Sequence, residues 1–166
     1  RSRSATRRRR RGARAAPRAA QAADWPARHV AYFSMEVALS NEIPTYSGGL
    51  GVLAGDTLRS AADLSVPIVG VSLVHRRGYF RQEIRNDRQV EHDAPWTPEH
   101  LLAELAPQVS VEIEGRPVRL RAWQYDIAGS TGYTVPVLLL DTDVSHNHPD
   151  DRRITDHLYG GDVRTR

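Results

Sequence analysis

The sequence predicts an α/β fold in which a helix connects two parallel strands. Residues 29–34 and 67–74 form two short, largely apolar segments of the kind found in buried strands. Between them, apolar residues recur at helical spacing over residues 49–64. A cluster of glycines directly precedes this helical segment. Strand, glycine loop, helix and strand together predict one βαβ unit over residues 29–74.

The helix of this unit is expected to bury one face. Residues 35–47, stiffened by Pro44, lead into it as a loop. The apolar residues that we expect on its buried face are Leu50, Leu53, Ala54, Leu58, Ala61, Ala62 and Leu64.

The glycine loop is the most informative part of the chain. Gly48, Gly49, Gly51 and Gly55 lie where the chain passes from a loop into the helix. Glycine allows backbone N–H groups to approach a ligand without an intervening Cβ. A helix start also aims unpaired N–H groups and the positive end of the helix dipole at one point. We therefore expect an anion, most often a phosphate, at this loop; a simple tight turn is the alternative interpretation.

Neither common nucleotide-binding motif fits this loop. The dinucleotide fingerprint Gly-x-Gly-x-x-Gly fails because Gly55 comes one residue too late after Gly51, and the glycines do not directly follow a strand. No acidic residue stands about twenty residues on, where a ribose would need one. The P-loop pattern fails as well, because no Gly-Lys-Ser/Thr follows.

The second half of the chain is rich in strand patterns. Residues 78–84 and 88–92 predict a hairpin around Asn86-Asp87. Thr97, with Pro98 at the first helical position, predicts the start of a short helix that ends at Leu105. Three further strands are expected at residues 108–113, 117–125 and 133–140, with turns at 114–115 and 129–132. As part of a larger sheet, they should leave strand edges and an apolar face exposed.

The charge of the chain is unevenly distributed. The formal net charge is +3, yet residues 1–28 hold ten arginines and one acid, including the arginine run 7–11. Such a segment has too few large apolar residues to bury a core, so residues 1–28 are expected to be a disordered tail. Three interpretations of the tail compete: a nucleic-acid-binding arm, a targeting segment, and upstream sequence read through a mis-set start. Arginine usage without any lysine favours the third.

Several separated blocks of the sequence resemble, in order, the N-terminal region of the α-glucan phosphorylases, the glycogen, starch and maltodextrin phosphorylase family. The similarity is greatest to the bacterial α-glucan phosphorylase branch and covers about residues 29–166. The blocks are Val30–Glu36, Ile43–Gly51, Ala54–Asp56, Ala61–Leu64, Val66–Val71, Gly78–Gln82, Leu138–Asp143 and Leu158–Asp162.

The resemblance implies a Rossmann-like N-terminal domain of the GT-B glycosyltransferase architecture over residues 29–166. It implies an enzyme that cleaves a terminal α-1,4 bond of a glucan with inorganic phosphate and releases glucose 1-phosphate. By position, Gly48, Gly49, Leu50 and Gly51 would border the sugar and phosphate groups, with Glu36 near the same pocket. Ala38 stands where the long muscle-type enzymes have a tyrosine near the cofactor, so that contact is not carried over.

The family's cofactor is pyridoxal phosphate, held as a Schiff base on a lysine. All 23 Lys-plus-Arg residues of this chain are arginine, so it has no lysine to form that bond. In the family this lysine lies in the C-terminal domain. The resemblance therefore identifies the chain as a phosphorylase fragment, truncated after Arg166, without catalytic residues of its own and inactive alone. The intact enzyme is expected to be cytoplasmic, and the resemblance allows a homo-oligomer.

Two other functions compete with this hypothesis. A GT-B sugar-nucleotide glycosyltransferase, such as a glycogen synthase, also opens with a strand and a glycine loop, but typically has lysine in a Lys-x-Gly-Gly arrangement. An Arg-tailed nucleic-acid-binding module is the second alternative.

Two smaller expectations concern the residues that follow the expected strands 67–74 and 133–140. Asp141, Asp143, His146 and His148 have the residue types of a metal site, but a polar loop is the favoured interpretation and no metal is expected. Arg76 and Arg77 follow the strand 67–74 and are expected to be exposed.

Overall fold

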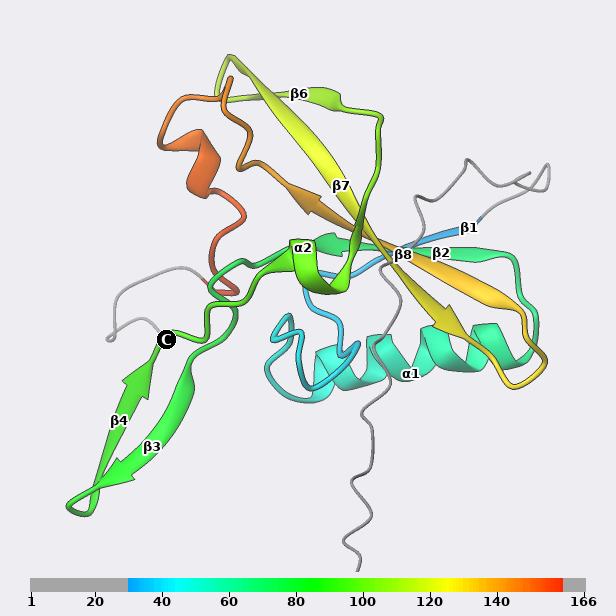
Figure 1. The fold of residues 1–166 in the computed structure, drawn as a ribbon, viewed down its shortest axis with the longest axis horizontal. Coiled ribbons are helices and arrows are strands. Elements are labelled where there is room, and N and C mark those ends of the chain that lie inside the picture. The colour runs from blue at the N-terminus through cyan, green and yellow to red at the C-terminus, as the bar shows by residue number, and fades with distance from the viewer. Residues whose placement is uncertain (1–29, 160–166) are drawn as a thin grey trace, which may run out of the picture.

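The computed structural model describes residues 30–159 as a mixed sheet with one long helix against it (Figure 1). The six-stranded sheet has the order β1-β2-β8-β7-β5, and β6 pairs with β7 outside this path. The sheet strands are β1 (Val30–Phe33), β2 (Ile68–Leu73), β5 (Ala103–Glu104), β6 (Val109–Ile113), β7 (Arg116–Ala128) and β8 (Thr134–Asp141). The other elements are α1 (Gly49–Asp63), β3 (Arg81–Arg85), β4 (Arg88–His92), α2 (Pro98–Leu101) and the 3-10 helix η1 (Asp151–Arg153).

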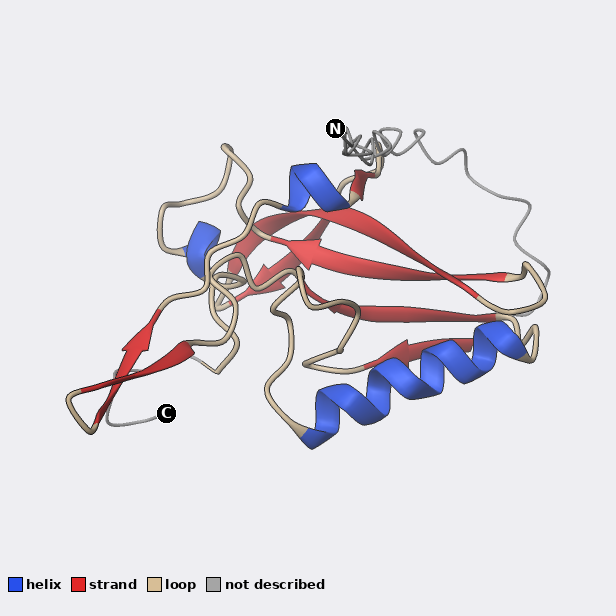
Figure 2. Cartoon of the chain, turned by 60° about the horizontal axis from the view of Figure 1, so that its bottom comes forward, coloured by secondary structure: helices blue, strands red, loops and turns tan. Residues whose placement is uncertain are grey.

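The βαβ unit predicted from the sequence is confirmed. β1 and β2 pair in parallel, with Val30 opposite Ile68 and Phe33 opposite Val71. α1 connects them and lies along one face of the sheet, as Figure 2 shows. The helix approaches β2 closely because Gly70 has no side chain: a Cβ there would lie 2.8 Å from Cδ1 of Leu58. This close packing holds the middle of α1 against β2.

β8 extends the parallel part of the sheet, and β7 changes its direction. β2 and β8 are parallel from Gly70–Val137 to Leu73–Leu140. β7 and β8 form a long antiparallel hairpin, and the strands expected at 108–113, 117–125 and 133–140 are all present. The core lies between the sheet, α1 and the loop 35–47; among its largest members are Ile43, Leu58, Trp123, Val135, Val137 and Leu139.

The first strand and the helix expose more apolar surface than we predicted. β1 was expected to be buried, but Val30 is 59% and Phe33 75% exposed, because β1 is an edge strand and α1 covers only one face. The prediction for the helix was also wrong in part: Leu50, Leu53 and Leu64 are exposed. The buried face of α1 instead consists of Gly51, Ala54, Gly55, Leu58, Ala61 and Ala62.

The helix predicted from Thr97 to Leu105 is much shorter in the structure. α2 ends at Leu101, and Leu102 is already extended, with φ −121° and ψ 159°. The chain then pairs with β7 as β5, with Ala103 opposite Gln124 and Glu104 opposite Trp123. Strand pairing thus replaces the helical hydrogen bonds after one turn, an outcome that local propensity does not encode.

The β3–β4 hairpin stands away from the rest of the fold in both views (Figures 1 and 2). Its register, Arg81–His92 to Arg85–Arg88, confirms the predicted turn at Asn86-Asp87, where both residues have positive φ. Within residues 30–159, no helix has the length and apolar character needed to cross a membrane. The predictions for the tail, residues 1–28, lie outside the described residues.

Candidate functional site

The glycine loop lies at the carboxyl end of β1, at the start of α1. Gly48 has φ +100°, a conformation that suits glycine, and it turns the chain into the helix. Val52 N–H donates to the Gly48 carbonyl at 3.2 Å. For the N–H groups of Gly49, Leu50 and Gly51, no acceptor is found among residues 30–159. The loop therefore presents the unpaired donors of a helix start, which an anion can satisfy.

The four glycines of the motif have two different roles. A Cβ on Gly48 or Gly49 would meet no atom within 4 Å, so this part of the loop is open. A Cβ on Gly51 would collide with Cβ of Tyr46, and one on Gly55 with the carbonyl oxygen of Ala38. Gly51 and Gly55 are therefore needed for close packing, whereas Gly48 and Gly49 leave space for a ligand.

Glu36 lies beneath the loop. Its side chain is buried, with the residue 1% exposed, and Oε2 accepts a hydrogen bond of 2.5 Å from the backbone N–H of Ser47. Oε1 accepts a hydrogen bond of 3.0 Å from the hydroxyl of Tyr159. The structure thus brings all the residues predicted for the site together, but in two layers. Gly48, Gly49 and Leu50 form the upper layer, and Glu36 and Gly51 are buried below them.

The loop that carries Glu36 is held to α1 by one backbone hydrogen bond and by the side chain of Arg59. Ala38 N–H donates to the Gly51 carbonyl at 2.9 Å, and Val37 N–H donates to the Thr45 carbonyl at 3.0 Å. The Arg59 guanidinium donates to the carbonyls of Ala38 and Leu39 at 2.8 and 2.9 Å. These bonds satisfy polar groups of a long irregular segment and fix it against the first turns of α1.

His75 fastens the start of the same loop to the end of β2. The ring is buried, and Nε2 lies 2.9 Å from the Met35 carbonyl, so Nε2 must carry a proton. Burial lowers the pKa of His75, although the carbonyls of Met35 and His157 and the Glu36 carboxylate oppose the shift. The neutral, Nε2-protonated ring therefore holds residues 34–36 in place.

The chain near Tyr159 contributes to the site, and the sequence did not predict this. Arg77 N–H donates to the Asp156 carbonyl at 2.8 Å, and Gly78 forms a parallel bridge with His157. The ring of Tyr159 then packs edge-on against Tyr79, with ring centroids 6.3 Å apart. In the sequence, Tyr159 stands out only as a member of the last block that resembles the phosphorylases. Its distance in the chain from Glu36 hides the contact.

Asp141, at the end of β8, is the centre of an ion network. Asp141 is fully buried and accepts bonds from Arg76 (2.7 Å), Arg121 (2.9 Å) and Nε1 of Trp123 (2.9 Å). Burial acts to raise the pKa of Asp141, but the hydrogen bonds from Arg76 and Trp123 outweigh it, so the pKa lies below its usual value. Within residues 30–159, no group of three or more His, Asp or Glu side chains is placed to hold a metal ion.

Arg76 differs from our expectation because of this network. Its side chain is only 18% exposed, since it bridges Asp141 and Glu99. Arg77, as expected, is exposed, and it pairs with Asp93 and Asp156. Both arginines therefore have acidic partners, and they line a second hollow together with Asp143, Pro149, Arg152, Arg153 and Asp156.

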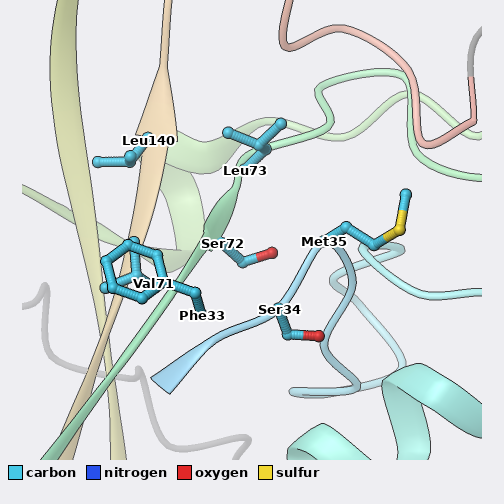
Figure 3. A pocket seen from close by; sticks show the side chains of 7 residues that line it. All are labelled: Phe33, Ser34, Met35, Val71, Ser72, Leu73 and Leu140. Atoms are coloured by element: carbon cyan, nitrogen blue, oxygen red, sulfur yellow. The ribbon is translucent and has the colours of Figure 1, made fainter. Parts of the chain in front are cut away.

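A hollow lies near the carboxyl ends of β1 and β2, and Figure 3 shows the side chains around it. Its lining is mostly apolar: Phe33, Ser34, Met35, Val71, Ser72, Leu73 and Leu140. The Ser34 hydroxyl donates to the Glu36 carbonyl at 2.6 Å. No charged side chain lines this hollow, so the glycine loop is the better candidate for an anion.

Comparison with known proteins identifies the family. The family model of carbohydrate phosphorylases matches residues 32–136. The chain is 39% identical over 145 residues, 82% of its length, to maltodextrin phosphorylase of Thermococcus litoralis. It is 41% identical over 146 residues, again 82% of its length, to glycogen phosphorylase of Mycobacterium tuberculosis. The chain spans only 17% and 16% of these two relatives. The chain therefore belongs to the carbohydrate phosphorylase family.

Proposed function

We propose that this chain is the N-terminal, Rossmann-like part of an α-glucan phosphorylase of the GT-B architecture. The reaction of the whole enzyme would be phosphorolysis of a terminal α-1,4 bond of a glucan to glucose 1-phosphate, in the cytoplasm. The similarity to maltodextrin and glycogen phosphorylases supports the family activity. The observation that carries the proposal for this part is the open glycine loop, with unpaired N–H groups at the start of α1.

The loop would act as a rigid donor of hydrogen bonds to an anion. Gly48 and Gly49 leave the backbone accessible, and Leu50 follows them on the first turn of α1. The helix dipole adds about 0.3–1 kcal/mol for a negative charge at such an exposed N-terminus. Preorganised N–H donors help catalysis because they need no reorientation when negative charge develops on the substrate or phosphate. Glu36 would support the loop rather than contact the anion, since its two oxygens bind Ser47 and Tyr159.

The family uses pyridoxal phosphate, but the side chains of this chain do not fit covalent attachment of that cofactor. The Schiff base forms on a lysine amine, and this chain has 23 arginines but no lysine. An arginine guanidinium stays protonated and does not replace that amine. We therefore assign the chain a binding role and no phosphorolytic activity of its own.

Backbone amide NMR of the chain, titrated with inorganic phosphate, tests the proposal. We expect the amide resonances of Gly48, Gly49, Leu50 and Gly51 to shift on titration, while those of the β3–β4 hairpin stay in place. A parallel titration with a nucleoside-diphosphate glucose distinguishes the glycogen-synthase-like alternative, which predicts a stronger response to the sugar nucleotide. If phosphate leaves the loop resonances unchanged, the proposed role of the loop is wrong.

An activity assay completes the test. The chain with added pyridoxal phosphate, maltodextrin and phosphate should release no glucose 1-phosphate. Product formation that survives repeated purification would contradict the assignment of a binding role alone.

A further inference from the structure

Three segments that are distant in the sequence meet under the glycine loop. The loop 35–47 carries Glu36, residues 75–79 follow β2, and residues 156–159 lie close to the end of the described chain. Tyr79 N–H donates to the Pro44 carbonyl at 3.2 Å, which joins the first two segments. The Gly78–His157 bridge joins the second and third. Glu36 completes the contact, because it binds Ser47 of the first segment and Tyr159 of the third.

Tyr159 is held in an unusual conformation for this contact. Its backbone has φ 56°, in the left-handed region that non-glycine residues rarely adopt. The residue is 38% exposed, so hydrophobic burial alone does not explain the position of its ring. Its hydroxyl reaches the buried Glu36 carboxylate at 3.0 Å, and its ring stands edge-on to Tyr79. Residues held in strained geometry by specific contacts often serve a site.

We propose that Tyr159 is a positioning residue, which holds the glycine loop in its anion-binding geometry by way of Glu36. This inference deepens the proposed function and rests on it for the identity of the ligand. Each oxygen of the Glu36 carboxylate accepts one hydrogen bond. Oε2 binds the N–H of Ser47, the residue just before the glycines, and Oε1 binds the hydroxyl of Tyr159. Loss of the phenol hydroxyl leaves a buried carboxylate oxygen with one partner fewer and frees the side chain to turn.

The chemistry of the phenol suits this role. Desolvation and the neighbouring Glu36 carboxylate raise the pKa of Tyr159, so the hydroxyl stays protonated and remains a donor. Because Glu36 is 1% exposed, a water molecule has little access to replace that donor. The glycine loop and residues 156–159 should stabilise each other, because coupling between two sites is reciprocal. Residues 156–159 should therefore become more ordered when an anion binds the loop.

Tyr159→Phe tests the proposal, because it removes one hydroxyl and keeps the ring. Tyr79→Phe is the matched control: it removes a phenol from the same aromatic pair without touching Glu36. Amide hydrogen exchange of the 166-residue chain is followed at Ser47 and Val52, the amides beside the loop that are hydrogen-bonded to Glu36 and Gly48, with the amides of β8 as an internal reference. We expect about tenfold faster exchange at Ser47 in Tyr159→Phe, because its N–H is bonded to Glu36, with no change in β8 and no change in Tyr79→Phe.

Phosphate titration of the same variants provides the second readout. Tyr159→Phe should weaken the phosphate-induced shifts of Gly49 and Leu50, while its melting temperature stays close to that of the parent chain. Glu36→Gln keeps an acceptor for Ser47 and should lie between the parent and Glu36→Ala. Equal exchange at Ser47 in Tyr159→Phe and in the parent would overturn the proposal. The exchange result stands without phosphate, so it separates failure of this inference from failure of phosphate binding.

Discussion

Gly51 on α1 and Tyr46 in the preceding loop pack so closely that the side chain of Tyr46 fills the place of a Cβ on residue 51. Oε2 of Glu36 would lie 3.3 Å from the same Cβ. Gly55, one turn later, has the same relationship with the carbonyl of Ala38. Two glycines of the motif, Gly51 and Gly55, therefore allow the close packing beneath the site, while Gly48 and Gly49 form its open surface.

Gly51→Ala should destabilise the fold. The added methyl group must displace Tyr46 or the first turn of α1, and overpacking of this kind costs about 1–3 kcal/mol. Chemical denaturation of the chain measures the loss in the free energy of unfolding. Leu50→Ala, at an exposed neighbouring position, is the control and should change it little. A Gly51→Ala chain as stable as the parent would show that the loop is not packed as described.

Gly49→Ala should have the opposite effect. No atom lies within 4 Å of a Cβ at this position, so the fold should tolerate the change. Alanine in the first turn of α1 should raise the free energy of unfolding by about 0.4–1 kcal/mol, because it restricts the unfolded chain. The new methyl group would nevertheless crowd an anion at the loop, so the phosphate-induced shifts should weaken. Denaturation and phosphate titration on the same sample check both effects, and a destabilised variant with normal phosphate binding would contradict the prediction.

Asp141→Asn should be strongly destabilising. It leaves Arg76 and Arg121 without the carboxylate that both contact, and breaking a buried charge pair costs about 3–5 kcal/mol. Asp56→Asn is the control, because Asp56 forms an exposed pair with Arg59. Urea denaturation of both variants at neutral pH measures the difference. Similar losses in the free energy of unfolding for the two variants would mean that the ion network of Asp141 contributes little to stability.

The same carboxylate predicts the acid sensitivity of the fold. The pKa of Asp141 is lowered in the folded chain, so its contribution is complete above the unfolded value of about 3.9 and is lost as the pH falls through the folded pKa. The free energy of unfolding should therefore fall more steeply below about pH 4 in the parent than in Asp141→Asn. Parallel slopes for the two chains would contradict this.

His75 predicts a separate change at milder pH. Burial lowers its pKa, so the unfolded chain takes up the proton first. The stability that His75 provides is complete above the unfolded value of about 6.5 and is lost as the pH falls from there through the folded pKa. His75→Gln retains a side-chain donor for Met35 and should flatten the stability profile between about pH 7 and 5. An unchanged profile in that variant would assign the titration to another residue.

The sequence was sufficient for the elements that depend on local pattern. The βαβ unit, the turn at Asn86-Asp87 and the β7–β8 hairpin follow from apolar spacing and turn residues. The end of α2 was predicted wrongly because pairing of Ala103 with β7 is a long-range contact. Apolar periodicity assigned Leu50 and Leu53 to the buried face, but small residues, Gly51 and Gly55, bring that side of α1 against its neighbours.

The sequence indicated the residues of the candidate site, but not the contacts that hold them together. Glycine spacing indicated the loop at Gly48 and Gly49, and the resemblance indicated Glu36. The contact between Glu36 and Tyr159 spans 123 positions, and no local pattern reports it. The role of Gly51 was equally hidden, because a glycine needed for packing and a glycine needed for a ligand look the same in a sequence.

The binding of an anion by the glycine loop can be seen directly in a structure of the chain determined with inorganic phosphate. We predict a phosphate oxygen at about 2.7–3.2 Å from the backbone nitrogen of Gly49 or Leu50, with Glu36 still bonded to Ser47 and Tyr159. Phosphate bound instead among the arginines near Asp141, with the N–H groups of Gly49 and Leu50 left unoccupied, would contradict it.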